Sequence, residues 1–176
     1  MDGDVRAFRI RTGHGKRDDR CNDCPSAFER CGKKGDQEEK ALGRSKGGLT
    51  TKIHAVVDAL GNPLRLLLTG GHRNDVTQAE ELLKGWQTTR VLADKGYDSN
   101  AVLANVAALN AEAVIPPKAN RVVQRVYDKE FYKERHLVEC FFNKLKQFRR
   151  VFSRFDQQAR NYLSFVQFAS MMIWLR

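Results

Sequence analysis

The sequence predicts an α/β fold in which helices pack against a mixed sheet, preceded by an irregular N-terminal arm. Between residues 52 and 175, runs typical of strands and helices follow one another in the order β-β-α-β-α-β-α-α. Residues 1–40 are instead crowded with Arg, Lys, Asp, Gly and Cys and show no sustained period. A chain of 176 residues, 41% of them hydrophobic, is long enough for one domain with a substantial core. We therefore expect an irregular, basic, Cys-containing arm over residues 1–40 and one domain over residues 41–176.

The first part of the predicted domain consists of a hairpin, a helix and a buried strand. Two strands are predicted by the runs KIHAVVDA and PLRLLLTG, which are joined by a turn at Gly61-Asn62. A helix follows in NDVTQAEELLKGW, where Asp75 is the expected N-cap and Gln78 stands three residues on. The apolar run Val91–Ala93 predicts a short buried strand that ends abruptly at Asp94.

The second part of the predicted domain is mainly helical. A helix capped by Ser99 is predicted in SNAVLANVAALN, and a strand in AEAVIPP ends at its prolines. Two long basic helices are predicted at about residues 129–150 and 158–175. The apolar run LSFVQFASMMIWL in the second of them is shorter than the roughly 20 residues of a membrane span, so we expect a core helix and no membrane partner.

The charge of the chain indicates what it binds. The formal net charge of +10 makes a polyanion the expected partner, because a basic surface attracts and steers phosphate backbones. Nucleic acid is therefore the first candidate. The run MDGDVRAFRIRTG has no apolar segment typical of a signal peptide, so we expect a cytoplasmic protein that lies on the nucleoid when it is bound to DNA.

One predicted helix carries polar side chains at uneven spacing. At about 100° per residue, Tyr132, Arg135, Glu139 and Lys146 fall within an arc of about 60°. An ordinary amphipathic helix whose polar face happens to hold these residue types is an alternative. Asp94, at the end of a buried strand, stands where open α/β sheets bind ligands, although it could equally be a turn or cap residue. Two such carboxylates can share a divalent cation such as Mg²⁺.

At these residues the sequence resembles a known family. Tyr132, Arg135, Glu139 and Lys146 match in full a signature that is found in the DDE transposases of bacterial insertion sequences. In that signature two residues separate Tyr from Arg, three separate Arg from Glu, and six separate Glu from Lys. Further segments resemble that family, namely GRSKGGLTTKIH, VVDALGNPL, LTGGHRND, ADKGYDS, VIPPKANR and FFNKLKQFRRVFSRFD. The resemblance covers residues 41–176 and implies a DDE catalytic domain with a ribonuclease-H-like fold.

The resemblance implies roles for these residues. Asp94 and Glu139 would be the second and third catalytic carboxylates and would bind Mg²⁺ or Mn²⁺. Lys146 and Arg135 would contact DNA near the cleaved strand, and Tyr132 would help to place it. The implied activity is metal-dependent cleavage and transfer of DNA strands at the element ends. Double-stranded DNA, as terminal inverted repeats and target, would be the partner, and the chain would associate with itself during synapsis.

Four further basic residues are candidates for contacts with DNA phosphates. They follow the signature on the two predicted C-terminal helices and between them: Lys144, Arg149, Arg150 and Arg154. A basic face that is merely solvated is the alternative for each of them.

The first carboxylate of the family has no clear match. The family carries it in a segment like Ile-Asp-Ala-Thr-Ile-Val-Arg-Ala-His, and here the nearest candidates are Asp2 and Asp4. A shift of the reading frame by one base within residues 19–35 would allow such a segment, so we hypothesise that residues 1 to about 34 are read out of frame. The domain would then lack its first strand, and the alternative function is a catalytically incomplete fragment that binds DNA and competes with or joins the full-length transposase.

The same hypothesis bears on a cysteine cluster in the arm. Cys21, Cys24 and Cys31, with His14 upstream, form a CxxC half-site that could bind zinc. An out-of-frame origin explains these cysteines without a metal. Cys140, beside Glu139, is expected to face the apolar side of its helix as a small core residue.

Overall fold

The computed structural model describes residues 8–17, 39–45, 48–121 and 124–176. The candidates Asp2 and Asp4, the cysteines at positions 21, 24 and 31, and most of the segment hypothesised to be out of frame lie outside these ranges. The chain divides into two compact units. Within the described residues, the first unit holds 8–11, 54–65 and 74–141, and the second holds 12–17, 39–53, 66–73 and 142–176.

The described strands form one mixed sheet. They are β1 (Phe8–Arg17), β2 (Gly43–Ser45), β3 (Gly48–Val57), β4 (Pro63–Gly70), β5 (Arg90–Ala93), β6 (Glu112–Val114) and β7 (Ser153–Arg154). Hydrogen-bonded neighbours follow the order β2-β3-β1-β5-β6, with β4 also on β3 and β7 also on β1. The pairs β1–β5, β5–β6 and β1–β7 are parallel, whereas β2–β3 is antiparallel. The predicted mixed sheet is confirmed.

Strand β1 corrects the prediction of an arm that is irregular throughout. Residues Phe8–Arg17 form a strand that pairs with β5, with Ile10 opposite Ala93, and β3 lies on its other side. The run includes two glycines, which strands disfavour, and so gave no strand signal. Strand propensity depends strongly on context, and hydrogen bonding to neighbours on both sides outweighs it here. A strand therefore lies beside β5, although its sequence holds no Asp that could serve as the family's first carboxylate.

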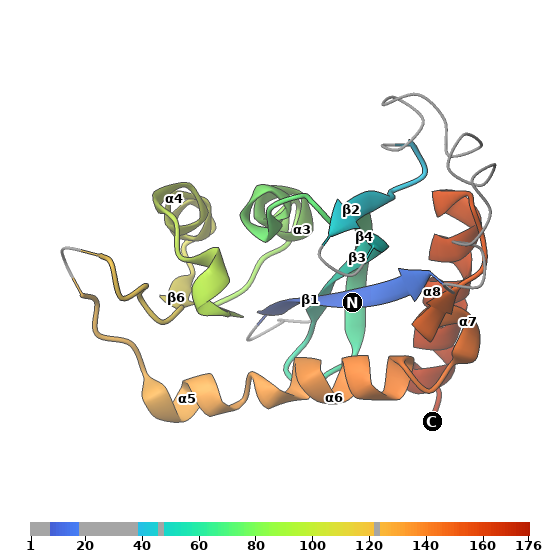
Figure 1. The fold of residues 1–176 in the computed structure, drawn as a ribbon. Helices are drawn as coiled ribbons and strands as arrows, with labels where there is room; N and C mark the ends of the chain where they lie inside the picture. The colour runs from blue at the N-terminus through green and yellow to red at the C-terminus, as the bar shows by residue number, and fades with distance from the viewer. Residues whose placement is uncertain (1–7, 18–38, 46–47, 122–123) are drawn as a thin grey trace. The chain divides into compact units, whose positions relative to one another are not determined.

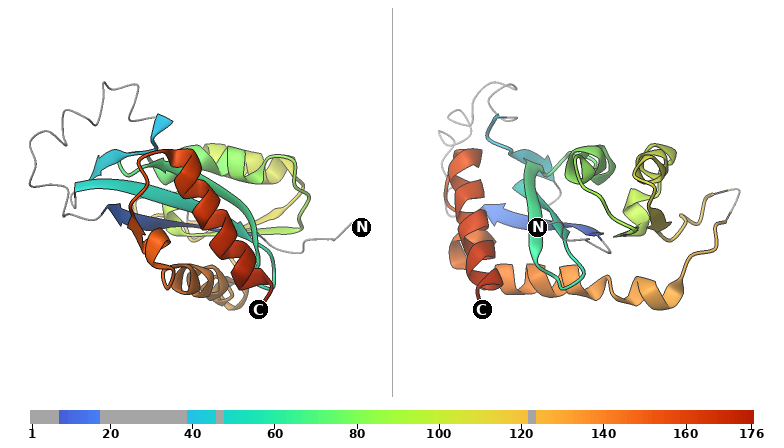
Figure 2. Two further views of the ribbon diagram at one scale, coloured as in Figure 1. Left: turned by 90° about the vertical axis from the view of Figure 1, so that its right-hand side faces the viewer. Right: turned by 180° about the vertical axis from the view of Figure 1, so that it is seen from behind.

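The helices follow the predicted order. The longer ones are α3 (Ala79–Leu83), α4 (Asn100–Ala108), α5 (Lys129–Lys133), α6 (His136–Leu145), α7 (Arg149–Phe152) and α8 (Ala159–Trp174), and two 3₁₀ turns are η2 (Asp75–Gln78) and η3 (Lys95–Tyr97). In the first unit, α3 and α4 lie on one side of β5 and β6, and α5 lies on the other (Figures 1 and 2). In the second unit, α7 packs against α8. No helix in the described ranges is both long and apolar enough to cross a bilayer.

Local hydrogen bonds explain where several elements begin. Ser99 caps α4 as predicted, because its hydroxyl accepts a hydrogen bond from the Val102 N–H at 3.2 Å. The cap predicted at Asp75 is wrong, since Asn74 caps the preceding 3₁₀ turn instead. The predicted hairpin turn is confirmed between β3 and β4. There the Asp58 carboxylate accepts the Asn62 N–H at 2.8 Å, and Gly61 has a φ of 88°.

The long helix predicted at residues 129–150 is broken into shorter pieces. α5 ends at Lys133 and α6 begins at His136. The Glu134 and Arg135 N–H groups bond to carbonyl groups three residues back, at 3.1 and 3.0 Å, which tightens the turn between the two helices. A further break follows Leu145, before α7. The helix predicted at residues 158–175 is confirmed as α8.

Glycines in the second unit allow a close approach of backbone segments. A Cβ atom on Gly71 would lie 1.9 Å from the Thr50 side-chain oxygen, and the Gly71 N–H donates to the Thr50 carbonyl at 2.9 Å. Thr50 is only 6% exposed, so neither group can move away freely.

We therefore expect Gly71→Ala to lower the free energy of unfolding by about 2 kcal/mol, measured by urea denaturation, because the added methyl group overpacks a buried contact. Gly96→Ala is the matched control, since a Cβ atom on Gly96 would meet nothing within 4 Å. Equal denaturation midpoints for the two variants would show that the contact with Thr50 does not limit the position.

Candidate active site

Asp94 stands at the carboxyl end of a fully buried strand. Val91, Leu92 and Ala93 of β5 are 0% exposed, and the half-buried Asp94 follows directly. Its Oδ1 atom accepts the Lys95 N–H at 2.7 Å and so caps the 3₁₀ turn η3. The interpretation of Asp94 as a cap is thus correct. The cap uses one carboxylate oxygen, Oδ1. The role of Asp94 as a cap is therefore compatible with binding of a ligand at the end of the strand.

Tyr132 brings the start of the signature to the same end of β5. It packs against a cluster formed by Leu92 of β5 and Val114 of β6, together with two neighbouring aromatic side chains. Its ring meets that of Tyr127 edge to face, with 5.6 Å between the ring centroids. A tyrosine on the polar side of α5 is therefore held by aromatic packing beside the strand that precedes Asp94.

The pKa of Tyr132 responds to its burial and to the charges around it. Burial raises this pKa above its ordinary value, and the guanidinium of Arg135 opposes the rise. The negative charges of Asp94 and Glu139 raise it further. The phenol is therefore protonated at neutral pH and can donate a hydrogen bond to an anionic oxygen.

Arg135 links the other two signature residues of this unit. Its Nη2 atom lies 2.8 Å from Oε1 of Glu139, and its guanidinium lies 5.5 Å from the centroid of the Tyr132 ring. The side chains of Arg135 and Glu139 are 23% and 35% exposed, so both can reach a ligand from solvent. The turn between α5 and α6 thus places a cation between a phenol and a carboxylate.

The fourth signature residue is not part of the first unit. Lys146 is exposed, belongs to the second unit, and follows directly after the end of α6. The prediction that a single helix carries all four residues was wrong, because the backbone breaks at Glu134–Arg135 and again after Leu145.

The donor atoms suit a hard divalent cation. Asp94 and Glu139 offer carboxylate oxygens, and Mg²⁺ is typically held by one or two carboxylates together with substrate phosphates. Within the described part of the chain, no group of three His, Cys, Asp or Glu side chains is placed to hold a metal. The described segment of β1, the neighbour of β5, has the sequence FRIRTGHGKR and contributes no acidic residue.

Comparison with known proteins identifies the family. The model described as "Transposase DDE domain" matches residues 25–172. The chain belongs to this family of DDE transposases. It is 45% identical over 130 residues to "Putative transposase for insertion sequence element IS6501" of Brucella ovis, a match that covers 73% of the chain and all of the relative.

A second relative and a solved structure extend the comparison. "Putative transposase for insertion sequence element IS402" of Burkholderia cepacia is 33% identical over 135 residues, which are 70% of this chain and 62% of the relative. A chain in the structure titled "CryoEM structure of simian T-cell lymphotropic virus intasome in complex with PP2A regulatory subunit B56 gamma" matches with a TM-score of 0.55 and 13% identity. That match covers 97% of the transposase chain and 48% of the viral-complex chain. It shows a shared fold, the predicted α/β ribonuclease-H-like fold.

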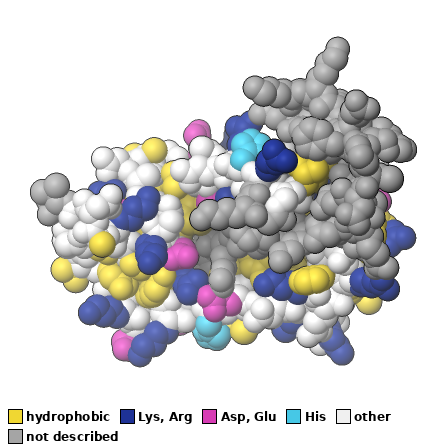
Figure 3. All heavy atoms as spheres, in the orientation of Figure 1, with side chains coloured by type: hydrophobic (Ala, Val, Ile, Leu, Met, Phe, Trp, Pro, Cys, Tyr) yellow, Lys and Arg dark blue, Asp and Glu magenta, His cyan; other side chains and the backbone are white. Residues whose placement is uncertain are grey.

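Three of the four basic candidates of the transposase are accessible. Lys144, Arg149 and Arg150 are exposed, and the two arginines lie over the rings of Phe155 and Phe165, at 5.9 and 4.6 Å from their centroids. On the face shown in Figure 3, Lys and Arg side chains are spread among acidic and apolar ones. These three residues remain predicted phosphate contacts.

Two predictions on this part of the transposase were wrong. Arg154 is only 1% exposed and donates hydrogen bonds within the second unit, so its guanidinium is not available to DNA. Cys140 is exposed and not a core residue. At about 100° per residue, it lies on the side of α6 away from the buried Val138, Phe141 and Leu145.

Sequence reasoning missed a buried carboxylate close to Asp94. Asp98 is 3% exposed and accepts hydrogen bonds from Arg121 at 2.7 Å, Arg125 at 2.6 Å and the Lys118 N–H at 2.8 Å. Burial tends to raise its pKa, but these three donors outweigh that effect and hold the pKa below its usual range. Asp98 thus ties the loop that carries Asp94 to the segment after β6. In the sequence, Asp98 is one acidic residue of ADKGYDS, and Lys118 and Arg121 belong to the basic run PPKANR. No local pattern indicates that these two segments form an ion pair.

Proposed function

We propose that this domain cleaves and transfers DNA strands at the ends of an insertion sequence by metal-dependent phosphoryl transfer. The observation that supports this proposal is the set of groups around Tyr132: Arg135 lies by its ring and pairs with Glu139, and the charges of Asp94 and Glu139 both raise its pKa. A carboxylate, a cation and a protonated phenol are thus adjacent, and the charge of a second carboxylate, Asp94, acts on the same phenol. This set of groups suits a phosphodiester with a divalent cation.

The side chains have distinct roles in the proposed reaction. A divalent cation, Mg²⁺ or Mn²⁺, held by Asp94 and Glu139 would neutralise the charge that develops on the phosphate. Arg135 donates to a non-bridging phosphate oxygen, and for this it exchanges its ion pair with Glu139 for the phosphate. The Tyr132 hydroxyl donates to the same phosphate group, so that both residues orient the phosphodiester.

The proposed chemistry takes place in two displacements. In the first, the oxygen of water attacks phosphorus and the 3′ oxygen leaves as a hydroxyl group. In the second, that hydroxyl attacks a phosphodiester of the target, and the target's own 3′ oxygen leaves with a proton. In each displacement one bond to phosphorus forms and one breaks. The protein therefore contributes mainly by positioning the reacting groups and by neutralising charge on the phosphate.

We infer that double-stranded DNA is the partner, as terminal repeats and as target. The net charge of +10 and the exposed Lys144, Lys146, Arg149 and Arg150 support this inference. Pairing of two element ends would also require copies of the chain to associate.

A second candidate function is DNA binding without cleavage. It is favoured by the sequence of β1, because the described strand beside β5 adds no Asp or Glu to the two carboxylates. The family resemblance implies three carboxylates, of which Asp94 and Glu139 supply the second and third. A chain of this kind would compete for element ends or join complete transposase molecules.

Cleavage of a labelled element end in Mg²⁺ or Mn²⁺ separates the two functions. We expect the wild-type chain to cleave, and Asp94→Ala and Glu139→Ala each to lower the cleavage rate at least about a hundredfold while binding in a gel-shift assay is retained. Glu112→Ala is the control, because this carboxylate is 56% exposed and pairs with Arg90. A wild-type chain that binds and does not cleave supports the second function, and cleavage that survives both substitutions refutes the site.

A further inference from the structure

Exposed apolar side chains gather in one stretch of the second unit. Among the described residues, nine large hydrophobic side chains are exposed, and seven of them lie between Phe152 and Leu175. Single exposed apolar residues are normal on a protein surface, but a contiguous group marks a surface for interaction. Most of this group belongs to the C-terminal half of α8.

Helix α8 carries a second apolar side besides its buried one. Tyr162, Val166 and Ala169 form its buried side. On the other side, a row at positions i, i+3, i+4 and i+7 forms the outer stripe of α8, with exposures of 57%, 46%, 45% and 77%: Phe168, Met171, Met172 and Leu175. An apolar stripe on a helix normally packs against a partner, and among the described residues these four side chains stay exposed.

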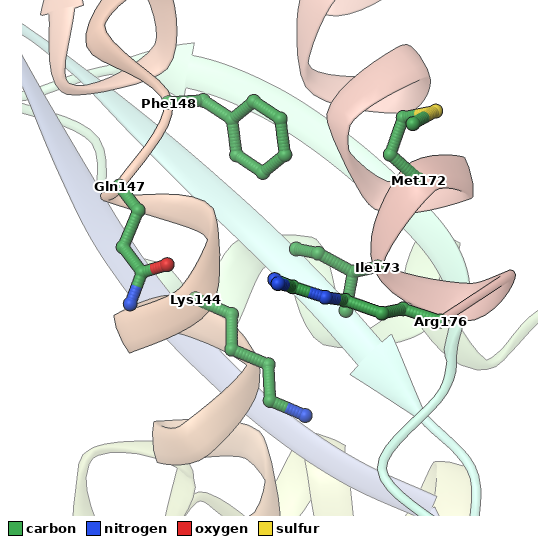
Figure 4. A pocket seen from close by; sticks show the side chains of 6 residues that line it. All are labelled: Lys144, Gln147, Phe148, Met172, Ile173 and Arg176. Carbon is green, nitrogen blue, oxygen red and sulfur yellow. The ribbon is translucent and has the colours of Figure 1, made fainter.

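A cavity adjoins the outer stripe. It has a volume of about 460 Å³ and is lined by Lys144, Gln147, Phe148, Met172, Ile173 and Arg176. Figure 4 shows the apolar side chains of Phe148, Met172 and Ile173 around it, from the α6–α7 segment and from α8. Because Met172 belongs to both features, the stripe and the cavity form one continuous surface.

The charge distribution along α8 selects the partner of the outer stripe. Residues 161–175 contain no charged side chain, although the whole chain carries a net charge of +10. Two copies of so basic a chain repel each other, and close contact is least costly where no like charges meet. A surface that binds DNA would instead carry Lys or Arg side chains to contact the phosphates, and the outer stripe has none. A row of apolar residues along one helix is also self-complementary, since it can pack against the same row of a second copy across a two-fold axis.

We propose that the outer stripe of α8 packs against the outer stripe of α8 in a second copy of this chain, forming a symmetric dimer. Sedimentation equilibrium of the full chain, without DNA or metal, tests this across concentrations from about 1 to 100 μM. We expect twice the mass of one chain for the wild type. The double variant Phe168→Glu/Met172→Glu is expected to show the mass of one chain, with a dissociation constant raised at least about a hundredfold.

Two controls keep the experiment decisive. Gln167→Glu adds a charge on the same helix, about 90° from the centre of the stripe, and should remain a dimer. Far-UV circular dichroism checks that the double variant is folded, and Phe168→Ser/Met172→Ser replaces it if the glutamates unfold the chain. A wild type with the mass of one chain at every concentration overturns the proposal, as does a folded double variant that dimerises like the wild type. Because DNA and metal are absent, neither result depends on whether the chain cleaves DNA.

Discussion

Replacement of Arg154 by Ala is expected to lower the free energy of unfolding by about 4 kcal/mol, the largest effect of any single substitution considered. The guanidinium is 1% exposed. Its five N–H groups donate to the carbonyl oxygens of Lys40, Ala41, Asp156 and Gln157 and to the Thr51 hydroxyl. One side chain therefore uses its full set of donors to join segments that are far apart in sequence.

The size of the expected effect follows from what the truncation leaves behind. Each buried acceptor that loses its donor costs about 1–3 kcal/mol. The guanidinium also lies 4.9 Å from the centroid of the buried Tyr162 ring, so its removal opens a cavity there. Burial raises the pKa of Tyr162 to about 12 although Arg154 opposes the rise, which agrees with a ring held deep in the unit.

Arg154→Lys tests whether charge or geometry matters at this position. A lysine keeps the charge but has three donors on one nitrogen, so it cannot reproduce the planar fork of five. We therefore expect it to be nearly as destabilising as Ala in urea or thermal unfolding. Arg160→Ala, at an exposed arginine of the same unit, should change stability by no more than about 0.5 kcal/mol. If Arg154→Ala changed the free energy of unfolding no more than Arg160→Ala does, the hydrogen bonds of Arg154 would make no net contribution to stability.

Asp98→Asn is the second substitution with a large expected effect, a loss of about 3 kcal/mol of unfolding free energy. The carboxylate is buried, and Arg121 and Arg125 donate to its two oxygens. An amide of the same shape leaves both guanidinium groups without their anion, and it turns one acceptor into a donor that faces another donor. Glu112→Gln is the matched control, since its ion pair with Arg90 is exposed and worth at most about 1 kcal/mol.

The effect of Asp98→Asn on stability is also expected to depend on pH. The folded-state pKa of Asp98 lies below its unfolded value, so its ionised form stabilises the fold at every pH above about 4. That stabilisation is lost as the pH falls through the folded-state pKa. The difference in unfolding free energy between wild type and Asp98→Asn should therefore be constant above the unfolded-state pKa of about 4 and shrink as the pH falls from there through the folded-state pKa. A difference that grew on acidification would contradict the assigned ion pairs.

Regular local patterns in this sequence predicted structure well. The apolar run Val91–Ala93 became a buried strand, Ser99 became a cap, and residues 158–175 became α8, because each depends on neighbours in sequence. Asp94 and Glu139 could be named as candidates from the sequence, since the end of an apolar run and the spacing of the family's signature can both be read along the chain. Their nearness to Tyr132 needed the fold.

Features that depend on distant partners could not be predicted. β1 has the composition of a loop and becomes a strand through its neighbours β3 and β5. Arg154 has the sequence context of a DNA-binding residue, yet its acceptors are more than half of the chain away or in the next turn. Asp98 and its arginines are separated by α4 and β6. The hypothesis of an out-of-frame N-terminal segment and that of a zinc half-site remain predictions, because they concern mainly residues outside the described ranges.

The pairing of β1 sets the order in which the protein can fold. β1 lies near the start of the sequence, yet one of its parallel partners, β7, is separated from it by most of the described chain. On the ribosome, that pairing must wait until α6 and α7 have emerged, so the end of β1 at Lys16 and Arg17 keeps an open edge after β3 and β5 have been made. Pairings over such long sequence distances fold slowly, and unpaired strand edges attract other chains. Synthesis of this protein therefore includes a period in which this edge is exposed to aggregation, and the period ends only when β7 arrives.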